Sequence, residues 1–216
     1  MNSPTQIPYR DLIKQNWIHS IADLAGMEPQ RGTIEGILDL YDEPDRHYHN
    51  IDHIGTMLVV FKSSRPKCTM PSEVTLAIIF HDAIYNPQAR DNEEKSAELA
   101  VETLATFGVP KVSLDLIEES ILSTKHHTPT AHPASTLIID TDLSILGSID
   151  EEYDKYSRAI RAEYSFVSNE DYRVGRTNVL KSFVNRDSIY LLPWFRERFE
   201  KQAQKNIELE IAMLEN

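Results

Sequence analysis

A histidine followed by an aspartate, His81-Asp82, lies within an apolar run that extends over residues 76–85. Such a run predicts a helix segment that faces the core, where an unpaired carboxylate costs on the order of several kcal/mol. No lysine or arginine lies within a helical turn of Asp82. Since imidazole nitrogen and carboxylate oxygen are ligands for Zn²⁺, Fe²⁺ or Mn²⁺, we expect a bound divalent cation to offset this cost.

A second pair of candidate residues, His49 and His53, is separated by four positions. On a helix this spacing places both side chains on one face, and the same face continues through Met57 and Val60. Two histidines of this kind can also be core residues whose ring nitrogens are hydrogen-bonded. The nearby His81-Asp82 favours the interpretation that they belong to a metal site.

The segment 137–146 contains two aspartates, of which one is expected to complete the ligand set. Residues two apart cannot share a helix face. Asp142 falls among the apolar residues of the predicted helix, whereas Asp140 falls among its small polar residues. Because a carboxylate on the buried face needs a cation, Asp142 is the predicted ligand, and Asp140 is expected to be solvated, to cap a helix or to support a ligand.

In this order, His53, His81-Asp82 and Asp142 resemble the H…HD…D signature of the HD-domain superfamily of metal-dependent phosphohydrolases. The string from Tyr48 to His53 resembles the YHNxxH motif of cyclic-nucleotide phosphodiesterases, a branch of that superfamily. In this motif the first histidine is the general acid and the second binds metal. The resemblance therefore implies that His49 is the acid and His53 a ligand.

The strings at 81–85, 91–94 and 142–147 are similar to those of bacterial HD proteins described as predicted metal-dependent phosphohydrolases. This similarity extends from about residue 46 to the C-terminal helix. The chain is too short for a complete phosphodiesterase catalytic domain, so the resemblance does not imply specificity for cyclic nucleotides.

Two imidazoles and two carboxylates would leave positions open on the ion for water and a phosphoryl oxygen. A bound divalent ion, whether Mn, Fe, Co, Ni, Zn or Mg, lowers the pKa of its water toward ~7 and polarises the phosphorus. A protonated His49 could donate to the leaving oxygen, a contribution of about 10²–10⁴-fold. One or two ions are compatible with the sequence.

The acidic segment 91–94 has two interpretations that both stay open. Asp91 and Glu94 have the spacing of a helix N-cap and its capping-box partner. Glu94 also shares a helix face with Ala97 and Val101, so it is expected to point inward. The resemblance implies that an acidic pair here orients the attacking water, which makes Asp91 and Glu94 candidate catalytic residues.

Four basic residues are candidates for binding the substrate. Lys125, His126 and His127 end a predicted helix, where cations are favourable for the helix dipole alone. The resemblance implies that a histidine here contacts substrate or a second metal, and the sequence does not say which. Arg46, next to the histidine pair, is a candidate phosphate clamp, and Arg161 and Arg176 are alternatives that could equally be ion-pair residues.

The apolar residues recur with a helical period nearly everywhere, and no useful strand alternation occurs. The expected helices cover about 12–24, 34–41, 49–61, 71–85, 97–104, 114–128, 137–146, 153–167, 171–184 and 193–214. We therefore predict an all-α, single-domain HD-type helical bundle over 1–216. Its metal-binding core is expected at about 46–147, with the C-terminal helices at about 150–216 packing on it.

Composition limits the function classes further. The net charge of −12 argues against binding to nucleic-acid polymers. Residues 1–6 do not resemble a signal peptide, and no apolar stretch approaches the roughly 18 residues of a membrane span. The single cysteine, Cys68, is expected to be inert in a reducing compartment, which favours the cytoplasm. The amphipathic C-terminal helix would permit a homodimer.

The leading hypothesis is a metal-dependent phosphohydrolase that acts on a small phosphate ester such as a nucleotide. One alternative is a nucleotide-binding regulatory module whose metal site does not turn over. A di-iron oxygenase of the HD type is another alternative. It would need two further histidines on separate helices, whereas His126, His127 and His132 cluster in the sequence.

Overall fold

The computed structural model describes residues 8–29, 31–64 and 68–216; the N-terminal residues 1–6 discussed above lie outside these ranges. All regular elements of the described residues are helices, which confirms the all-α prediction. The chain divides into two compact units, Met1–Ile139 and Asp140–Asn216. This boundary falls inside helix α7 (Pro133–Asp142), so the expected metal-binding core at 46–147 extends across it.

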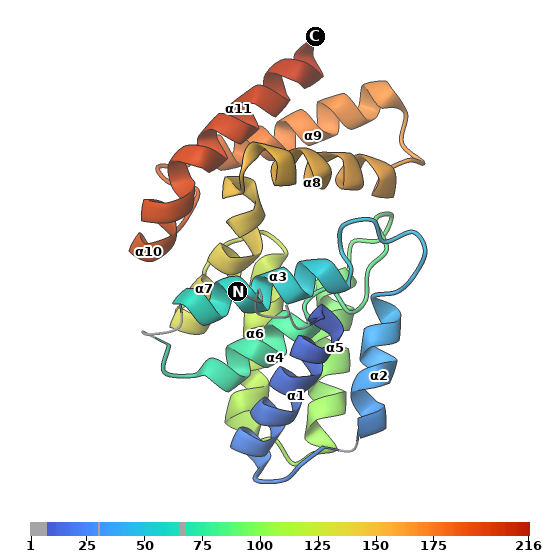
Figure 1. The fold of residues 1–216 in the computed structure, drawn as a ribbon, viewed down its shortest axis with the longest axis vertical. Coiled ribbons are helices and arrows are strands. Elements are labelled where there is room, and N and C mark those ends of the chain that lie inside the picture. Colours follow the sequence, from blue (N-terminus) through green and yellow to red (C-terminus); the bar gives the residue numbers. More distant parts are fainter. Residues whose placement is uncertain (1–7, 30, 65–67) are drawn as a thin grey trace, which may run out of the picture. The chain divides into compact units, whose positions relative to one another are not determined.

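The first unit is built around a short apolar helix, α4 (Pro71–Phe80) (Figure 1). Helices α1 (Tyr9–Ala25), α3 (Ile51–Ser64), α5 (Asn92–Ala105) and α6 (Lys111–Thr124) all pack against α4, and α2 (Arg31–Leu40) contacts α1. Residues Val74 to Phe80 of α4 are all buried. A helix that is apolar on every side is stable only at the centre of a bundle, and α4 occupies that position.

Aromatic rings join α1 to the centre of this unit. Trp17 is fully buried, and its ring lies 5.8 Å from the rings of both Phe80 and Phe107, measured between centroids. Pro71 opens α4 as predicted, because proline fits the first turn of a helix. At the C-terminal end of α1, Gly26 adopts a φ of +66° and its N–H donates to the carbonyl of Ala22. This glycine therefore ends the helix.

Several helix boundaries differ from the sequence-based expectation, and two of them concern the side chains of the candidate metal site. Helix α4 ends at Phe80, so His81 and Asp82 lie in the following turn and not on the helix. Helix α3 begins at Ile51, so His49 precedes it. In both places side chains satisfy backbone groups that a longer helix would have bonded. Asn50 Oδ1 accepts from the amides of Asp52 and His53, for example.

The second unit contains a 3₁₀ helix, η2 (Leu143–Gly147), followed by α8 (Asp150–Glu163) and α9 (Asn169–Val184). The expected helix at 193–214 is observed as three consecutive pieces: α10 (Pro193–Phe195), a π-helical turn η3 (Arg196–Glu200) and α11 (Lys201–Glu215). Helix α11 packs along α9 and η2. A buried ion pair joins α9 to α11, with Arg176 Nε 2.8 Å from Glu210 Oε1.

Three further expectations concern a membrane span, the single cysteine and a homodimer. No helix within the described ranges is long and apolar enough to cross a membrane. Cys68 is a half-buried thiol that is not part of a disulfide. Exposed apolar side chains occur on α9 and α11, among them Val174, Leu209 and Met213. The homodimer stays a prediction.

Candidate metal centre

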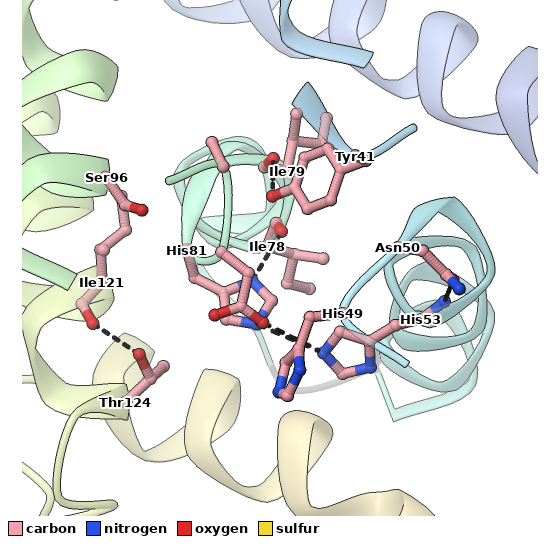
Figure 2. Close-up of polar contacts among 12 residues, drawn as sticks. Tyr41, His49, Asn50, His53, Ile78, Ile79, His81, Ser96, Ile121 and Thr124 are labelled. Carbon is pink, nitrogen blue, oxygen red and sulfur yellow. Dashed lines mark hydrogen bonds and ion pairs between the residues drawn. The ribbon is translucent and has the colours of Figure 1, made fainter. Parts of the chain in front are cut away.

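Two histidines and an aspartate of the first unit converge and could hold a metal ion. His53 Nε2 lies 3.3 Å from His81 Nε2. Asp82 Oδ2 lies 2.9 Å from His81 Nε2 and 3.6 Å from His53 Nε2. His53 comes from the first turn of α3, and the other two come from the turn after α4. Figure 2 shows the rings of His53 and His81 close together in an edge arrangement, with His49 beside them.

The spacing of these three atoms fits the ligands of one ion. Ligands about 2.1 Å from a metal lie roughly 3.0 Å apart in octahedral and roughly 3.4 Å apart in tetrahedral geometry. His81 Nδ1 is 2.9 Å from the carbonyl oxygen of Ile78, to which it can donate. With Nδ1 bonded in this way, Nε2 is the ring nitrogen that faces His53 and Asp82, as in metal-binding histidines. The side chains therefore fit a divalent cation.

The electrostatics of Asp82 agree with such a site. Burial alone would raise the pKa of this carboxyl, but the charge and hydrogen bond of His81, with the charges of His49 and His53, bring the pKa well below its usual value. Asp82 is therefore an ionised carboxylate in a largely buried place. Burial, and then the negative charge of Asp82, raise the pKa of Tyr41 well above its ordinary value.

His49 lies beside the cluster of His53, His81 and Asp82, but it does not lie on helix α3, where it was expected. It belongs to the turn before α3, so the prediction that it shares a helix face with His53 is wrong. Its ring stacks on Tyr85, with centroids 4.2 Å apart and planes 27° apart, and lies 5.9 Å from the ring of His53. Asn50, which caps α3 and so creates this turn, was missed. An asparagine just before a helical run is its sequence signal.

The two aspartates of α7 have the opposite burial from that expected. Asp140 is fully buried, and its carboxylate accepts from the amides of Leu191, at 2.8 Å, and Leu192, at 2.6 Å. Burial raises the pKa of Asp140 to about 6, although these two amide bonds lower it. The backbone amides of Leu191 and Leu192 thus stabilise this buried carboxylate without a cation. The argument that a buried carboxylate in this helix requires a cation is therefore wrong. Asp142 is half-buried in the second unit, and its role as fourth ligand stays a prediction.

The acidic segment before α5 makes ion pairs. Asp91 is the N-cap residue, but its side chain makes no capping hydrogen bond and instead pairs with Lys95 at 2.9 Å, so the capping box is not formed. Glu94 is exposed, so the expectation that it points inward is wrong. Its carboxylate accepts a hydrogen bond from Lys125 Nζ, which lowers the pKa of Glu94. The catalytic roles of Asp91 and Glu94 stay predictions.

The expectation that Lys125, His126 and His127 form the last turn of a helix is wrong, because α6 ends at Thr124 and these residues lie in the turn that follows. His126 lines a surface cavity of about 380 Å³ together with three acidic residues, Asp115, Glu118 and Glu119. An acidic lining disfavours a phosphate there. His127 has a φ of +47°, which is uncommon for a residue with a side chain. The substrate contacts predicted for Lys125, His126 and His127 stay predictions.

The three candidate phosphate clamps direct their guanidinium groups at protein atoms. Arg46 donates to backbone carbonyls of His49, Asp82 and Ala83. Arg161 donates to the carbonyls of Tyr164 and Val167, and Arg176 to Glu210. These contacts remove the basis for the phosphate-clamp prediction, because the donors expected to bind phosphate are already used.

Comparisons with protein-family models, with curated proteins and with solved structures found no match to this chain. The side chains of the metal centre are therefore the basis for a functional proposal.

Proposed function

We propose that this protein is a metal-dependent phosphohydrolase of the HD type that acts on a small phosphate ester such as a nucleotide. The observation that supports this proposal is the convergence of His53 Nε2, His81 Nε2 and Asp82 Oδ2 within 3.6 Å of one another. Two imidazoles and a carboxylate from separate segments are a donor set for a borderline divalent ion. Asp142 is the proposed fourth ligand.

The ion, when bound, supplies a Lewis acid that activates water and draws charge from a phosphoryl group. The carbonyl of Ile78, 2.9 Å from His81 Nδ1, favours the tautomer in which Nε2 could bind the ion. His49 is the proposed general acid toward the leaving oxygen. The charges of Asp82 and a protonated His49 attract each other, and the ring of Tyr85 fixes the orientation of His49. Both features favour a protonated His49 ring oriented to donate its proton to the leaving oxygen.

The proposed substrate is small because the protein carries a net charge of −12. Such a charge repels a long polyanion along its whole length, whereas one phosphate group is attracted locally by the ion. Lys125, His126 and His127 are the proposed substrate contacts, with the acidic residues beside His126 disfavouring a phosphate at that one residue. All three lie in the turn after α6, where His126 is exposed and Lys125 and His127 are half-buried.

Metal analysis combined with a phosphate-release screen tests the proposal. Purified protein loaded with Mn²⁺, Co²⁺, Ni²⁺ or Fe²⁺ should release phosphate from one or more nucleotides, monoesters or diesters, and a chelator should abolish release. Asp82→Asn should lose both metal and activity because the carboxylate ligand is gone. Asp45→Asn, which changes an exposed aspartate in the segment between α2 and α3, is the matched control and should retain both.

Three results would contradict the proposal or redirect it. Wild-type protein that binds no divalent ion would refute the metal centre, as would Asp82→Asn with unchanged metal content. Metal binding without hydrolysis across the whole panel would favour the regulatory module instead.

A further inference from the structure

Arg46 is a buried arginine in the turn between α2 and α3, and its side chain is only 3% exposed. A buried guanidinium is costly unless its N–H groups are hydrogen-bonded. The Nε atom donates to Glu43 Oε2 at 2.9 Å, and Glu43 itself is largely exposed. The remaining donors point inward, at main-chain oxygens.

These main-chain oxygens belong to the two segments that carry the proposed chemistry. Arg46 Nη1 lies 3.2 Å from the carbonyl oxygen of His49 and 2.6 Å from that of Asp82, and Nη2 lies 2.8 Å from that of Ala83. Because α4 has already ended, no helical amide of the described residues donates to the carbonyls of the Asp82 turn, and a cation is favourable there. One planar group thus bonds the His49 turn and the Asp82 turn at the same time.

Two tyrosine rings hold this guanidinium and extend its contacts to the site. The Arg46 Cζ atom lies 5.1 Å from the ring centroid of Tyr41 and 5.6 Å from that of Tyr85. Tyr85 also stacks on the His49 ring. The Tyr41 hydroxyl donates to the carbonyl of Ile79 at 2.8 Å, next to Ile78, the hydrogen-bond partner of His81 (Figure 2).

We propose that Arg46 is a positioning residue that fixes the His49 turn against the Asp82 turn, so that metal ligand and proton donor keep their separation. This inference rests on the proposed function, because it assumes an ion held by His53, His81 and Asp82. It replaces the role of a phosphate clamp. A lysine would supply a single ammonium, which cannot reproduce the fixed fork of donors that reaches all three carbonyls.

Cobalt binding to Arg46→Lys tests this role without an activity assay. Co²⁺ is titrated into metal-free wild type and variant, and the affinity and visible absorption spectrum are recorded. Loss of a group that orients metal ligands weakens binding by about 10–100-fold, and we expect this loss with a changed spectrum. Arg176→Lys, the same substitution at a buried arginine of the second unit, should lower thermal stability but bind Co²⁺ within about twofold of wild type.

A second variant decides the test if Arg46→Lys does not fold. Tyr85→Leu removes the ring between the guanidinium and His49, and we expect weaker Co²⁺ binding by a smaller factor. Wild-type affinity and spectrum in Arg46→Lys, or in Tyr85→Leu when only that variant folds, would overturn the inference. Equal weakening in Arg176→Lys would also overturn it, because the effect would then be general destabilisation. Failure of the proposed function is distinguishable, since wild type itself would bind no Co²⁺.

Discussion

At the scale of single residues, one hydrogen bond selects the ring nitrogen of His81 that can bind an ion. Nδ1 is engaged by the carbonyl of Ile78, so Nε2 is directed toward His53 and Asp82. The three atoms then meet within ligand distance of one point. The sequence predicted the residue types of this group, but the tautomer depends on a carbonyl that only the end of α4 brings into place.

His49→Ala separates proton donation from metal binding. We expect turnover to fall by about 10²–10⁴-fold because the proposed general acid is removed. Metal content should stay near that of wild type, since His53, His81 and Asp82 are unchanged. Elemental analysis and steady-state kinetics measure the two effects. His47→Ala, an exposed histidine two residues earlier, is the control. Metal lost with His49 but kept without His53 would show that the two roles are exchanged.

At the scale of elements, the close approach of α1 to α3 explains why α3 contains a glycine. A Cβ atom added to Gly55 would lie 2.6 Å from the Cβ of Tyr9 and would overlap with its ring. Helix α3 also carries His53, so the same contact fixes the position of a metal ligand relative to α1. The small residue is required by the distance between the helices and not by the helical conformation itself.

Two glycine substitutions test this explanation. Gly55→Ala should lower the free energy of unfolding by about 1–3 kcal/mol, because overpacked side chains must shift. Gly36→Ala is the matched control in α2, where an added Cβ meets nothing within 4 Å. It should raise stability by up to about 1 kcal/mol through helix propensity and a less flexible unfolded chain. Urea denaturation measures both. Equal effects of the two substitutions would contradict the packing explanation.

At the scale of the whole molecule, the two units keep different chemistry in their interiors. The first unit contains the His53, His81 and Asp82 group. The second unit buries the pair of Arg176 and Glu210, to which Tyr153 donates a hydrogen bond of 2.6 Å. Burial raises the pKa values of Tyr153, Tyr156 and Tyr172 in this unit, that of Tyr172 to about 12. These tyrosines make the second unit sensitive to alkaline pH.

The sign of this pH dependence follows from the raised pKa of Tyr172. Below pH 10 the hydroxyl is protonated in both states, and its contribution to stability is constant. Between about pH 10 and 12 the unfolded chain loses the proton first, so stability falls as pH rises, by about 3 kcal/mol in total for this residue. Tyr172→Phe should remove that part of the decrease. Urea denaturation at a series of pH values compares the two proteins, and parallel curves would contradict the prediction.

Tyr172→Phe should also be tolerated at neutral pH. Its hydroxyl is buried, and the described residues provide no hydrogen-bond partner for it. Replacing an unsatisfied buried hydroxyl by hydrogen is neutral or stabilising by about 1 kcal/mol. The neutral-pH point of the same urea series measures this, and a clear loss of stability would indicate a partner for the hydroxyl.

The sequence by itself determined the helical class, a core-facing helix at the position of α4 and three members of the candidate metal centre. The class and the helix follow from the period of apolar residues and a proline at a helix start, and His81 and Asp82 from a costly carboxylate inside an apolar run. His53 was predicted from its spacing to His49 and from the resemblance. Apart from the resemblance, these signals depend only on residues that are close in the sequence, so they can be interpreted without knowing which distant residues are in contact.

Only the tertiary structure decided which polar groups are already satisfied. Asp140 was expected on a polar face, but amides of Leu191 and Leu192, remote in sequence, make its burial tolerable. Arg46 was expected to bind phosphate, but carbonyls of the Asp82 turn occupy its donors. Helical periodicity indicates on which face of a helix a residue lies. It does not indicate which backbone groups from a distant part of the chain will contact that face. Those backbone groups decide whether a buried charge needs a ligand.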